Sequence, residues 1–233
     1  TADNSTTYMS FFSQMDTYGD GYAGIGVWRA AFKPLVDRIA DTDIRLQWFC
    51  CDRSTGVTDA SGNRITLIRD TQSPVAVEYQ AVKFIGTGRD NIKAGVFSGW
   101  ELGDYIYLRS EEAYMIKMEA LAHKSSAEAV TELNSFMKTR QPDYNYTFTN
   151  KADLIEEIIY QKRVEFWGEG LEYIDNRRLN IPVDRTDETW GAENNNHFSA
   201  GKFRYNQEDR PFLYQLPLSE IENNSQLSPS DQN

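Results

Sequence analysis

The feature that most constrains the fold is a succession of apolar residues at helical spacing in the second half of the chain. Within residues 107–123, the apolar residues at helical spacing are Leu108, Met115, Met118 and Ala122. A second stripe follows and consists of Val130, Leu133, Phe136 and Met137. Between them, Ser125 and Glu128 have the spacing of a capping box, and Pro142 closes the second stripe. The pattern predicts two helices joined by a tight turn, an αα-hairpin of roughly the size of one tetratricopeptide unit.

A third helix is expected after this hairpin. Asn150 is a favoured N-cap residue, and a wide apolar stripe follows it, formed by Leu154, Ile155, Ile158 and Ile159. A tetratricopeptide solenoid needs about three repeats to bury its faces, and the sequence shows only one. The chain also begins at Thr1 with neither an initiating Met nor a targeting pattern. We therefore expect a truncated piece of a longer protein, with further packing partners of the hairpin outside it.

The third helix leads into a charged run, RVEFWGEGLEYIDNRR at residues 163–178, which holds four carboxylates, three arginines and three aromatic residues. If the helix continued at about 100° per residue, Glu165, Glu169 and Glu172 would share a narrow sector with the apolar stripe. Carboxylates on a core-facing line have to be paired, because burying a lone charge is costly. The run therefore predicts a structural ion network, whose members are Arg109, Arg163, Glu165, Glu169, Asp175 and Arg178.

A catalytic interpretation of the same run stays open. A glycoside hydrolase uses one carboxyl group as an acid and a second as nucleophile or base, and Glu165 with Glu169 would be such a pair. The two groups have to stand across a sugar, whereas glutamates on adjacent turns of one helix line a single wall. Gly168 and Gly170 complicate both interpretations, since two glycines can bend or end the helix. The geometry favours the structural network.

The N-terminal part of the chain predicts a few short strands. Residues 43–50 alternate polar and apolar side chains, which is typical of a half-buried strand. Its core-facing residues would be Ile44, Leu46, Trp48 and Cys50. A turn at 61–63 and a second strand at 65–68 would complete a long hairpin over 43–69, and residues 75–84 are a further strand candidate.

The whole pattern predicts a mainly α fold with long loops and a few short β-hairpins. Residues 1–103 form a loop-rich segment with the hairpins, the candidate ligand-binding region, and include a short helix at 32–40 that starts near Pro34. Residues 104–180 hold the helical hairpin with a third and a fourth helix, and 181–233 form a polar loop region expected to pack on the helices. A last capping box, Ser219 with Glu222, precedes the polar tail. We expect these three parts to make one structural domain.

The composition excludes several classes of function. A formal net charge of -11 argues against nucleic acid as a partner, because neutralising phosphates needs clustered Lys and Arg. No run of about 18 apolar residues is present, so no transmembrane helix is expected. Cys50 and Cys51 are adjacent, which disfavours a bond between them and gives no metal-ligand spacing. The only two histidines, His123 and His197, lack the surroundings of a catalytic triad.

Two motif matches near the N-terminus fail on closer inspection. Residues 19–24 match G-x-G-x-x-G, but no βαβ unit surrounds them, so a dinucleotide site is not expected. Asp16, Asp20 and Gly21 fall on EF-hand calcium-loop positions, but Val27 stands where the loop needs a bidentate Glu. A calcium loop of another kind stays open. We expect no cofactor, no metal site and no catalytic residues.

Four runs, taken in order, resemble those of the SusD/RagB family, the outer-membrane nutrient-binding lipoproteins of Bacteroidetes. The runs are PLVD followed by DIRL (34–46), YLRSEEAY continuing to MEA (107–120), RVEFWGEGLEYIDNRR (163–178) and PLSEI (217–221). The chain departs from the family pattern at Gln161, where Glu is common, and at Glu172, where a basic residue is common. Family members also carry an N-terminal half with most of the tetratricopeptide helices and a lipid-bearing Cys, which this chain lacks.

The resemblance implies a SusD/RagB-like fold and a non-enzymatic role. The protein would bind a glycan at the bacterial surface and pass oligosaccharide to a SusC-like TonB-dependent transporter. It would be a surface-exposed lipoprotein of the outer membrane, held there only through an N-terminal lipid anchor absent from this chain.

Loop aromatics are the candidates for glycan contact, because aromatic faces stack on the C–H faces of sugar rings. Tyr18, Tyr22 and Trp28 lie in the Gly-rich N-terminal segment, and packing of that loop on the hairpin is an equally good explanation of them. Trp48 is expected in the core. Two further function classes stay open, a glycoside hydrolase with a carboxylate pair and a tetratricopeptide-type scaffold that binds a protein.

Overall fold

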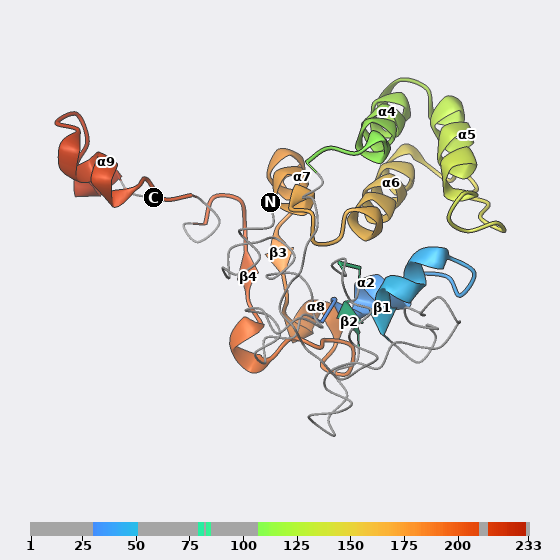
Figure 1. Ribbon diagram of the computed structural model, residues 1–233, viewed down its shortest axis with the longest axis horizontal. Helices are drawn as coiled ribbons and strands as arrows, with labels where there is room; N and C mark the ends of the chain where they lie inside the picture. The colour runs from blue at the N-terminus through green and yellow to red at the C-terminus, as the bar shows by residue number, and fades with distance from the viewer. Residues whose placement is uncertain (1–29, 51–78, 82, 85–106, 210–213, 232–233) are drawn as a thin grey trace, which may run out of the picture. The chain divides into compact units, whose positions relative to one another are not determined.

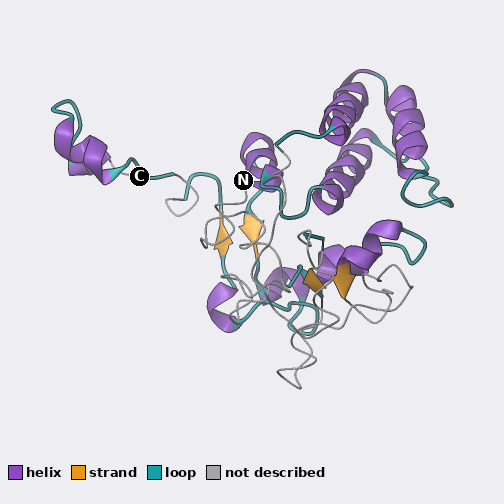
Figure 2. Ribbon diagram, in the orientation of Figure 1, coloured by secondary structure: helices purple, strands orange, loops and turns teal. Residues whose placement is uncertain are grey.

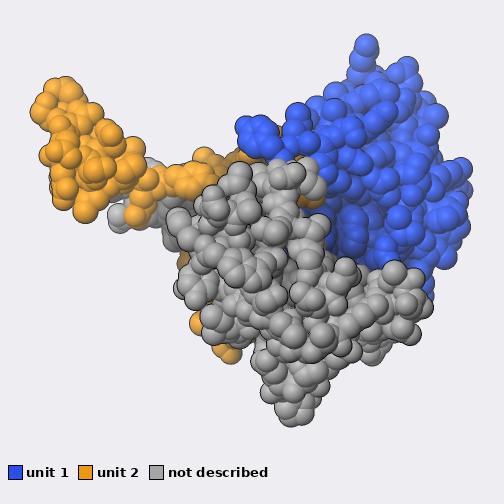
Figure 3. All heavy atoms as spheres, in the orientation of Figure 1, with its two compact units in different colours: residues 1–168 blue, residues 169–233 orange. Residues whose placement is uncertain are grey.

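The computed structural model describes residues 30–50, 79–81, 83–84, 107–209 and 214–231. Two compact units are distinguished, Thr1–Gly168 and Glu169–Asn233, which Figure 3 colours separately. Helices make up most of the regular structure in the described residues, and the strands are short (Figure 2). The mainly α architecture with short β pairs predicted from the sequence is therefore confirmed. The division at residues 103 and 180 stays a prediction, because much of the first part lies outside the described residues.

Three helices of the first unit pack side by side, as Figure 1 shows: α4 (Ser110–Lys124), α5 (Ser126–Met137) and α6 (Lys151–Glu165). The predicted αα-hairpin and third helix are thus confirmed. Their contact surface is built from the predicted stripes, and its fully buried side chains are Met115, Met118, Leu133, Met137, Leu154 and Ile158. Each such side chain contributes about 1.5–3 kcal/mol through removal from water. Leu108 is an exception, since it precedes α4 and is exposed.

Of the three predicted helix caps, only the one at Asn150 is confirmed. The Asn150 side-chain oxygen accepts a hydrogen bond from the backbone N–H of Asp153 at 3.0 Å. Ser125 occupies the N-cap position of α5, but its side chain makes no capping bond. Its backbone instead joins both helices, because its N–H donates to Leu121 and its carbonyl accepts from Ala129. The predicted Ser219 cap is also wrong, since Ser219 lies inside α9 (Leu218–Asn223).

The predicted strand at 43–50 is wrong over most of its length. The segment forms the 3₁₀ helix η2 (Ile44–Trp48), and only β1 (Phe49–Cys50) is extended. The alternation is also broken, because Ile44 is 53% exposed and Arg45 is 1% exposed, although Leu46 is buried as predicted. The physical reason is the Asp43 carboxylate, which accepts from the Arg45 backbone N–H at 2.9 Å and from its guanidinium. A side chain that bonds the backbone two residues ahead favours a turn over a strand.

A second apolar core of the first unit joins the N-terminal segments to α6. The helix α2 (Lys33–Asp37) forms as predicted, with its Pro in the first turn. The β1 strand pairs antiparallel with β2 (Gln80–Ala81), which lies within the predicted strand 75–84. The partner expected at 65–68 lies outside the described residues. This core consists of Ala31, Val36, Ile39, Leu46, Phe49, Ala81, Tyr160 and Val164.

The charged run contains the end of one helix and the start of another. The helix α6 ends at Glu165, and α7 (Leu171–Leu179) begins after Gly170. Gly168 and Gly170 have φ angles of 78° and 86°, a left-handed backbone that glycine adopts with least strain. The helix therefore does not continue through the run, so Glu165, Glu169 and Glu172 do not share one helical sector, and the alternative that the glycines end the helix is confirmed.

The second unit contains short elements where mostly polar loop was expected. After α7 come β3 (Val183–Asp184), α8 (Asp187–Trp190), η4 (Ser199–Gly201), β4 (Arg204–Tyr205), α9 and η6 (Pro229–Asp231). The strands β3 and β4 pair antiparallel, with Val183 opposite Tyr205. The fourth helix predicted from the sequence is α7.

We predict that Asn150→Ala and Ser125→Ala have different effects on stability. Asn150→Ala removes a side-chain cap and should lower the free energy of unfolding by about 1 kcal/mol. Ser125→Ala should change it by less than half of that, because the Ser125 side chain caps nothing. Urea denaturation of both variants checks this. Equal losses would contradict the assignment of the caps.

Candidate functional site

The aromatic residues predicted to contact glycan lie outside the described residues. This holds for Tyr18, Tyr22 and Trp28, and also for the glycine-rich stretch 19–24 that surrounds them. The described residues do include all six members of the predicted ion network, and these are found in both units.

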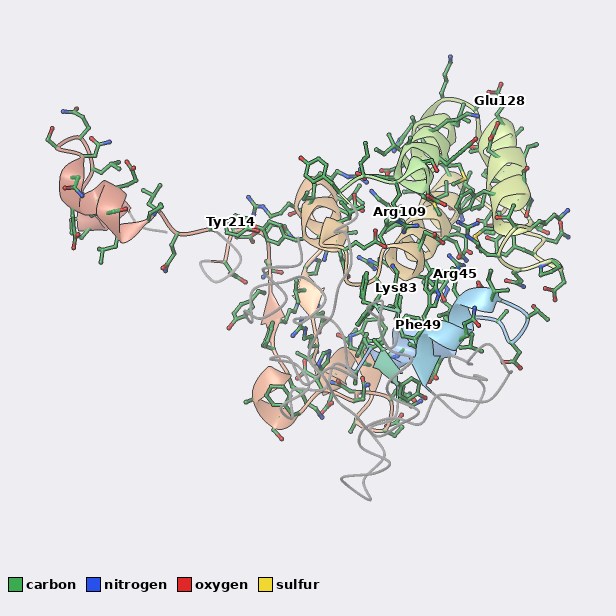
Figure 4. All side chains as sticks on the ribbon, viewed as in Figure 1. Arg45, Phe49, Lys83, Arg109, Glu128 and Tyr214 are labelled. Carbon is green, nitrogen blue, oxygen red and sulfur yellow. The ribbon has the colours of Figure 1, made fainter. Side chains whose placement is uncertain are left out.

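Glu165 is the centre of a buried charge cluster in the first unit. Its side chain is 2% exposed and receives arginines from three separate segments. Its Oε1 accepts from Arg109 Nη1 at 3.1 Å and from Arg140 Nη2 at 3.2 Å. Arg45 Nη1 lies 3.5 Å from Oε2. Figure 4 labels Arg45 and Arg109, which reach α6 from different segments of the chain.

The cluster extends outward through these arginines. Arg45, itself 1% exposed, donates to the buried carboxylate of Asp43 at 2.7 Å and to the side-chain oxygen of Gln161. Arg140 also pairs with Glu111 at 3.2 Å. Gln161 departs from the family pattern. It supplies an uncharged acceptor to Arg45, which also contacts the carboxylates of Asp43 and Glu165. A buried cation is tolerated only when its hydrogen-bond donors are matched in this way.

Burial and the arginines act in opposite directions on the pKa of Glu165. Burial by itself raises this pKa, because it disfavours the charged form. The hydrogen bond and charge of Arg140 lower it, as do the charge of Arg45 and the hydrogen bond of Arg109. The arginines prevail, so the pKa of Glu165 lies below its ordinary value of 4.5. The group is ionised throughout the neutral range.

The same arginines and a lysine also satisfy the backbone where α6 ends. Arg109 Nη2 donates to the Glu165 carbonyl at 3.0 Å, and Lys83 Nζ donates to it at 2.7 Å. Lys83 donates further to the carbonyl of Trp167 at 3.1 Å. The last carbonyls of a helix lack partners and carry partial negative charge, so cations stabilise them. The cluster thus fixes both the side chain and the backbone at this turn.

The other predicted members of the network lie on α6, on α7 and in the turn between them. Asp175 and Arg178 meet within α7, at 2.8 Å, and Asp175 is buried. Glu169 is partly buried and belongs to the second unit, while Arg163 is partly buried on α6. The sequence-based prediction omitted Arg45 and Arg140. Asp43, two residues before Arg45, could have indicated a turn that buries Arg45. The polar–apolar alternation of this segment instead predicted a strand.

This geometry leaves Glu165 unsuited to acid–base catalysis. A glycosidase acid needs a raised pKa and contact with substrate, whereas Glu165 has a lowered pKa and almost no exposed surface. Its oxygens are occupied by arginines instead. The glycoside hydrolase interpretation that relied on Glu165 therefore loses one of its two carboxyl groups.

A second, smaller cluster surrounds Asp184 in the second unit. Its carboxylate accepts from Thr186 N–H at 3.0 Å and from the hydroxyls of Thr186 and Thr189, both at 2.7 Å. Arg204 from the paired strand contributes a salt bridge. Burial raises the pKa of Asp184, but the bonds from Thr189, Thr186 and Arg204 outweigh it and hold the pKa at about 2. The interactions close the β3–α8 turn and link it to β4.

The described residues contain no group of three or more His, Cys, Asp or Glu side chains that could hold a metal ion. None of the helices in the described ranges is both long enough and apolar enough to span a membrane.

We predict that Glu165→Gln destabilises the first unit by about 3 kcal/mol at neutral pH, because it removes the charge that three arginines share. A lowered folded-state pKa means that the contribution of Glu165 is complete above its unfolded pKa and is lost as the pH falls through the folded-state pKa. The difference in the free energy of unfolding between wild type and variant should therefore become smaller below about pH 4. Urea denaturation at a series of pH values measures this difference.

The control is Glu128→Gln, which neutralises an exposed glutamate on α5, labelled in Figure 4. It should change stability by less than about 1 kcal/mol. A Glu165→Gln effect no larger than this control would contradict the buried cluster.

Comparisons with known proteins agree with the resemblance found in the sequence. The model of the SusD family matches residues 79–233. A solved structure described as a SusD-like carbohydrate binding protein from Bacteroides vulgatus ATCC 8482 superposes with a TM-score of 0.66 at 22% sequence identity. The superposition covers 97% of this chain and 46% of that one, so this chain spans about half of its length. No match was found among curated proteins. Since the family model covers most of the chain, the protein belongs to the SusD family.

Proposed function

We propose that the whole protein binds glycans at the bacterial outer surface and delivers oligosaccharide to a SusC-like TonB-dependent transporter. The observation that carries this proposal is the SusD family match over residues 79–233, on a fold similar to that of a SusD-like carbohydrate binding protein. The proposal concerns the complete protein, because this chain covers 46% of that structure.

The proposed contact residues are Tyr18, Tyr22 and Trp28. Aromatic rings bind sugars through apolar contact with C–H faces, and neighbouring polar groups bind the hydroxyls. The segment that holds these rings also contains Asp16, Asp20 and several glycines, which supply acceptors and close backbone approach. Loops carried by a rigid scaffold are the usual place for such contacts.

The proposed role is non-enzymatic. Glu165 supports this, since the most conspicuous carboxylate of the charged run is buried and bonded to Arg45, Arg109 and Arg140. A binding protein also needs no perturbed acid, whereas a glycosidase acid has to keep its proton near neutral pH. We further propose that the complete protein is a surface-exposed lipoprotein of the outer membrane, held there by an N-terminal lipid.

We predict that the protein retains polysaccharides in affinity gels and binds a subset of a glycan array, and that Trp28→Ala weakens binding at least about tenfold. Truncating a stacked indole at a binding hot spot commonly costs about 2 kcal/mol or more. The measurement is affinity electrophoresis followed by calorimetry on the retained glycan, with Tyr18→Ala and Tyr22→Ala run in parallel.

The control is Phe198→Ala, which removes an aromatic side chain that is 75% exposed and outside the proposed site. It should leave binding unchanged. Binding that survives Trp28→Ala undiminished would remove Trp28 from the site. Release of reducing sugar from the retained polysaccharide would contradict the non-enzymatic role.

A further inference from the structure

A polar pocket of about 440 Å³ opens on the first unit, away from the Glu165 side chain. Three segments line it: the residues after α2, the loop after α5, and one side of α6. The lining includes Arg38, Asp43, Asn145, Tyr146, Glu157 and Gln161. Its volume lies within the range of about 300–1,000 Å³ that small-molecule sites occupy. None of these residues was singled out as a ligand-binding residue in the sequence, and the ion cluster reaches the cavity only through Asp43 and Gln161.

The charges in the floor of the pocket are already compensated. Glu157, with a side chain 13% exposed, pairs with Arg38 Nη2 at 2.6 Å and accepts from the Tyr144 hydroxyl at 2.8 Å. Gln161 Nε2 donates to the same carboxylate at 2.7 Å. Asp43 is paired with Arg45. A charged ligand would have to displace one of these partners, so the floor favours a neutral one.

The loop that forms one wall is held in place before any ligand arrives. Asn134 Oδ1 accepts from the Tyr146 backbone N–H at 2.7 Å, and its Nδ2 donates to the Tyr146 carbonyl at 3.1 Å. The Thr42 hydroxyl donates to Asp143 at 2.6 Å and so ties the loop to the segment before η2. Arg38 is fixed as well, since its guanidinium lies 3.9 Å from the centre of the Tyr160 ring. A preformed pocket loses little conformational entropy on binding.

The rim supplies hydrogen-bonding groups with capacity to spare. Asn145 is exposed, and its side chain makes no hydrogen bond to any described residue. Asp143 is exposed; its carboxylate accepts from Thr42 and from the side chain of Gln141, and a carboxylate can accept further hydrogen bonds. Tyr146 also lines the pocket and is partly buried, with its hydroxyl oxygen inside the protein. The pocket therefore combines an amide, a carboxylate and a tyrosine on a preorganised, charge-balanced floor.

We propose that this pocket is a second, weaker site for neutral saccharides, contacted by Asn145, Asp143 and Tyr146. Directed hydrogen bonds from polar side chains, together with the lining tyrosines Tyr144, Tyr146 and Tyr160, suit a polyhydroxylated ring. A basic peptide suits the pocket less well, because Glu157 and Asp43 already hold arginines. The site is made of residues other than the N-terminal aromatics and rests on the proposed function only for its ligand class.

The test is an NMR titration of the full chain, observing the side-chain amides of Asn145, Gln141 and Gln161. The probes are neutral hexasaccharides of glucose, xylose and mannose, raised to millimolar concentration. At least one hexasaccharide should shift these amides in a saturable way. Asn145→Ala should weaken the response of the two glutamines about two- to tenfold, the value of a lost hydrogen bond. The matched control Asn194→Ala, an exposed asparagine of the second unit, should not weaken it.

The same titration in a Trp28→Ala background separates the two proposals. Pocket shifts that persist there support the second site, even if array binding is lost or absent. No shift with any hexasaccharide would overturn the pocket proposal, while leaving array binding through the loop aromatics intact. Shifts that vanish in Trp28→Ala but survive Asn145→Ala would also overturn it. So would amides that respond to a basic alanine–arginine peptide and to no sugar.

Discussion

The structure of the first unit depends on one buried carboxylate and the cations that neutralise it. Glu165 ends α6, and the groups that bind it come from far along the chain: Arg109 is 56 residues away and Lys83, on the adjoining carbonyl, is 82. An ionised group in this position is stable only if all of these segments are in place together. The cluster therefore couples the N-terminal segments, the entry to α4 and the loop after α5 to one helix end. Such long-range coupling makes folding of the unit cooperative.

The Glu165 cluster belongs to the part of the chain that holds the fold. The helices and the Glu165 cluster form a scaffold whose polar groups are largely bonded to one another. At the rim of the pocket, the Asn145 side chain makes no hydrogen bond within that scaffold. Binding residues commonly occupy loops on a rigid scaffold, since loops tolerate change that a packed core does not. Glycan specificity could then vary among relatives without disturbing the cluster.

The sequence predicted the helices well because their signal is local. Met115, Met118, Leu133 and Ile158 repeat at helical spacing, and all four are fully buried. The Asn150 cap was predictable for the same reason. Arg45 was not, because its burial depends on Asp43, Gln161 and Glu165, and only the first is near it in sequence. Nothing in a two-residue alternation reveals a carboxylate more than a hundred residues away.

The charged run was only half predictable for a related reason. Pairing of Glu165 with Arg109 could be anticipated from the need to compensate charge beside an apolar stripe. Which residues face the core beyond Gly168 and Gly170 could not be predicted from the periodicity of α6. The left-handed backbone of these glycines separates α6 from the next helix. The pocket at Asn145 could not be predicted from the sequence, because it is formed by three segments that are distant from one another in the chain.

The most direct test of the central claim is the pKa of Glu165 itself. Selective ¹³C labelling of glutamate side chains would allow its carboxyl group to be titrated by NMR in the folded chain. An internal ion cluster requires a pKa of Glu165 below its ordinary value of 4.5. A value raised above 4.5, as a catalytic acid would need, would contradict the account.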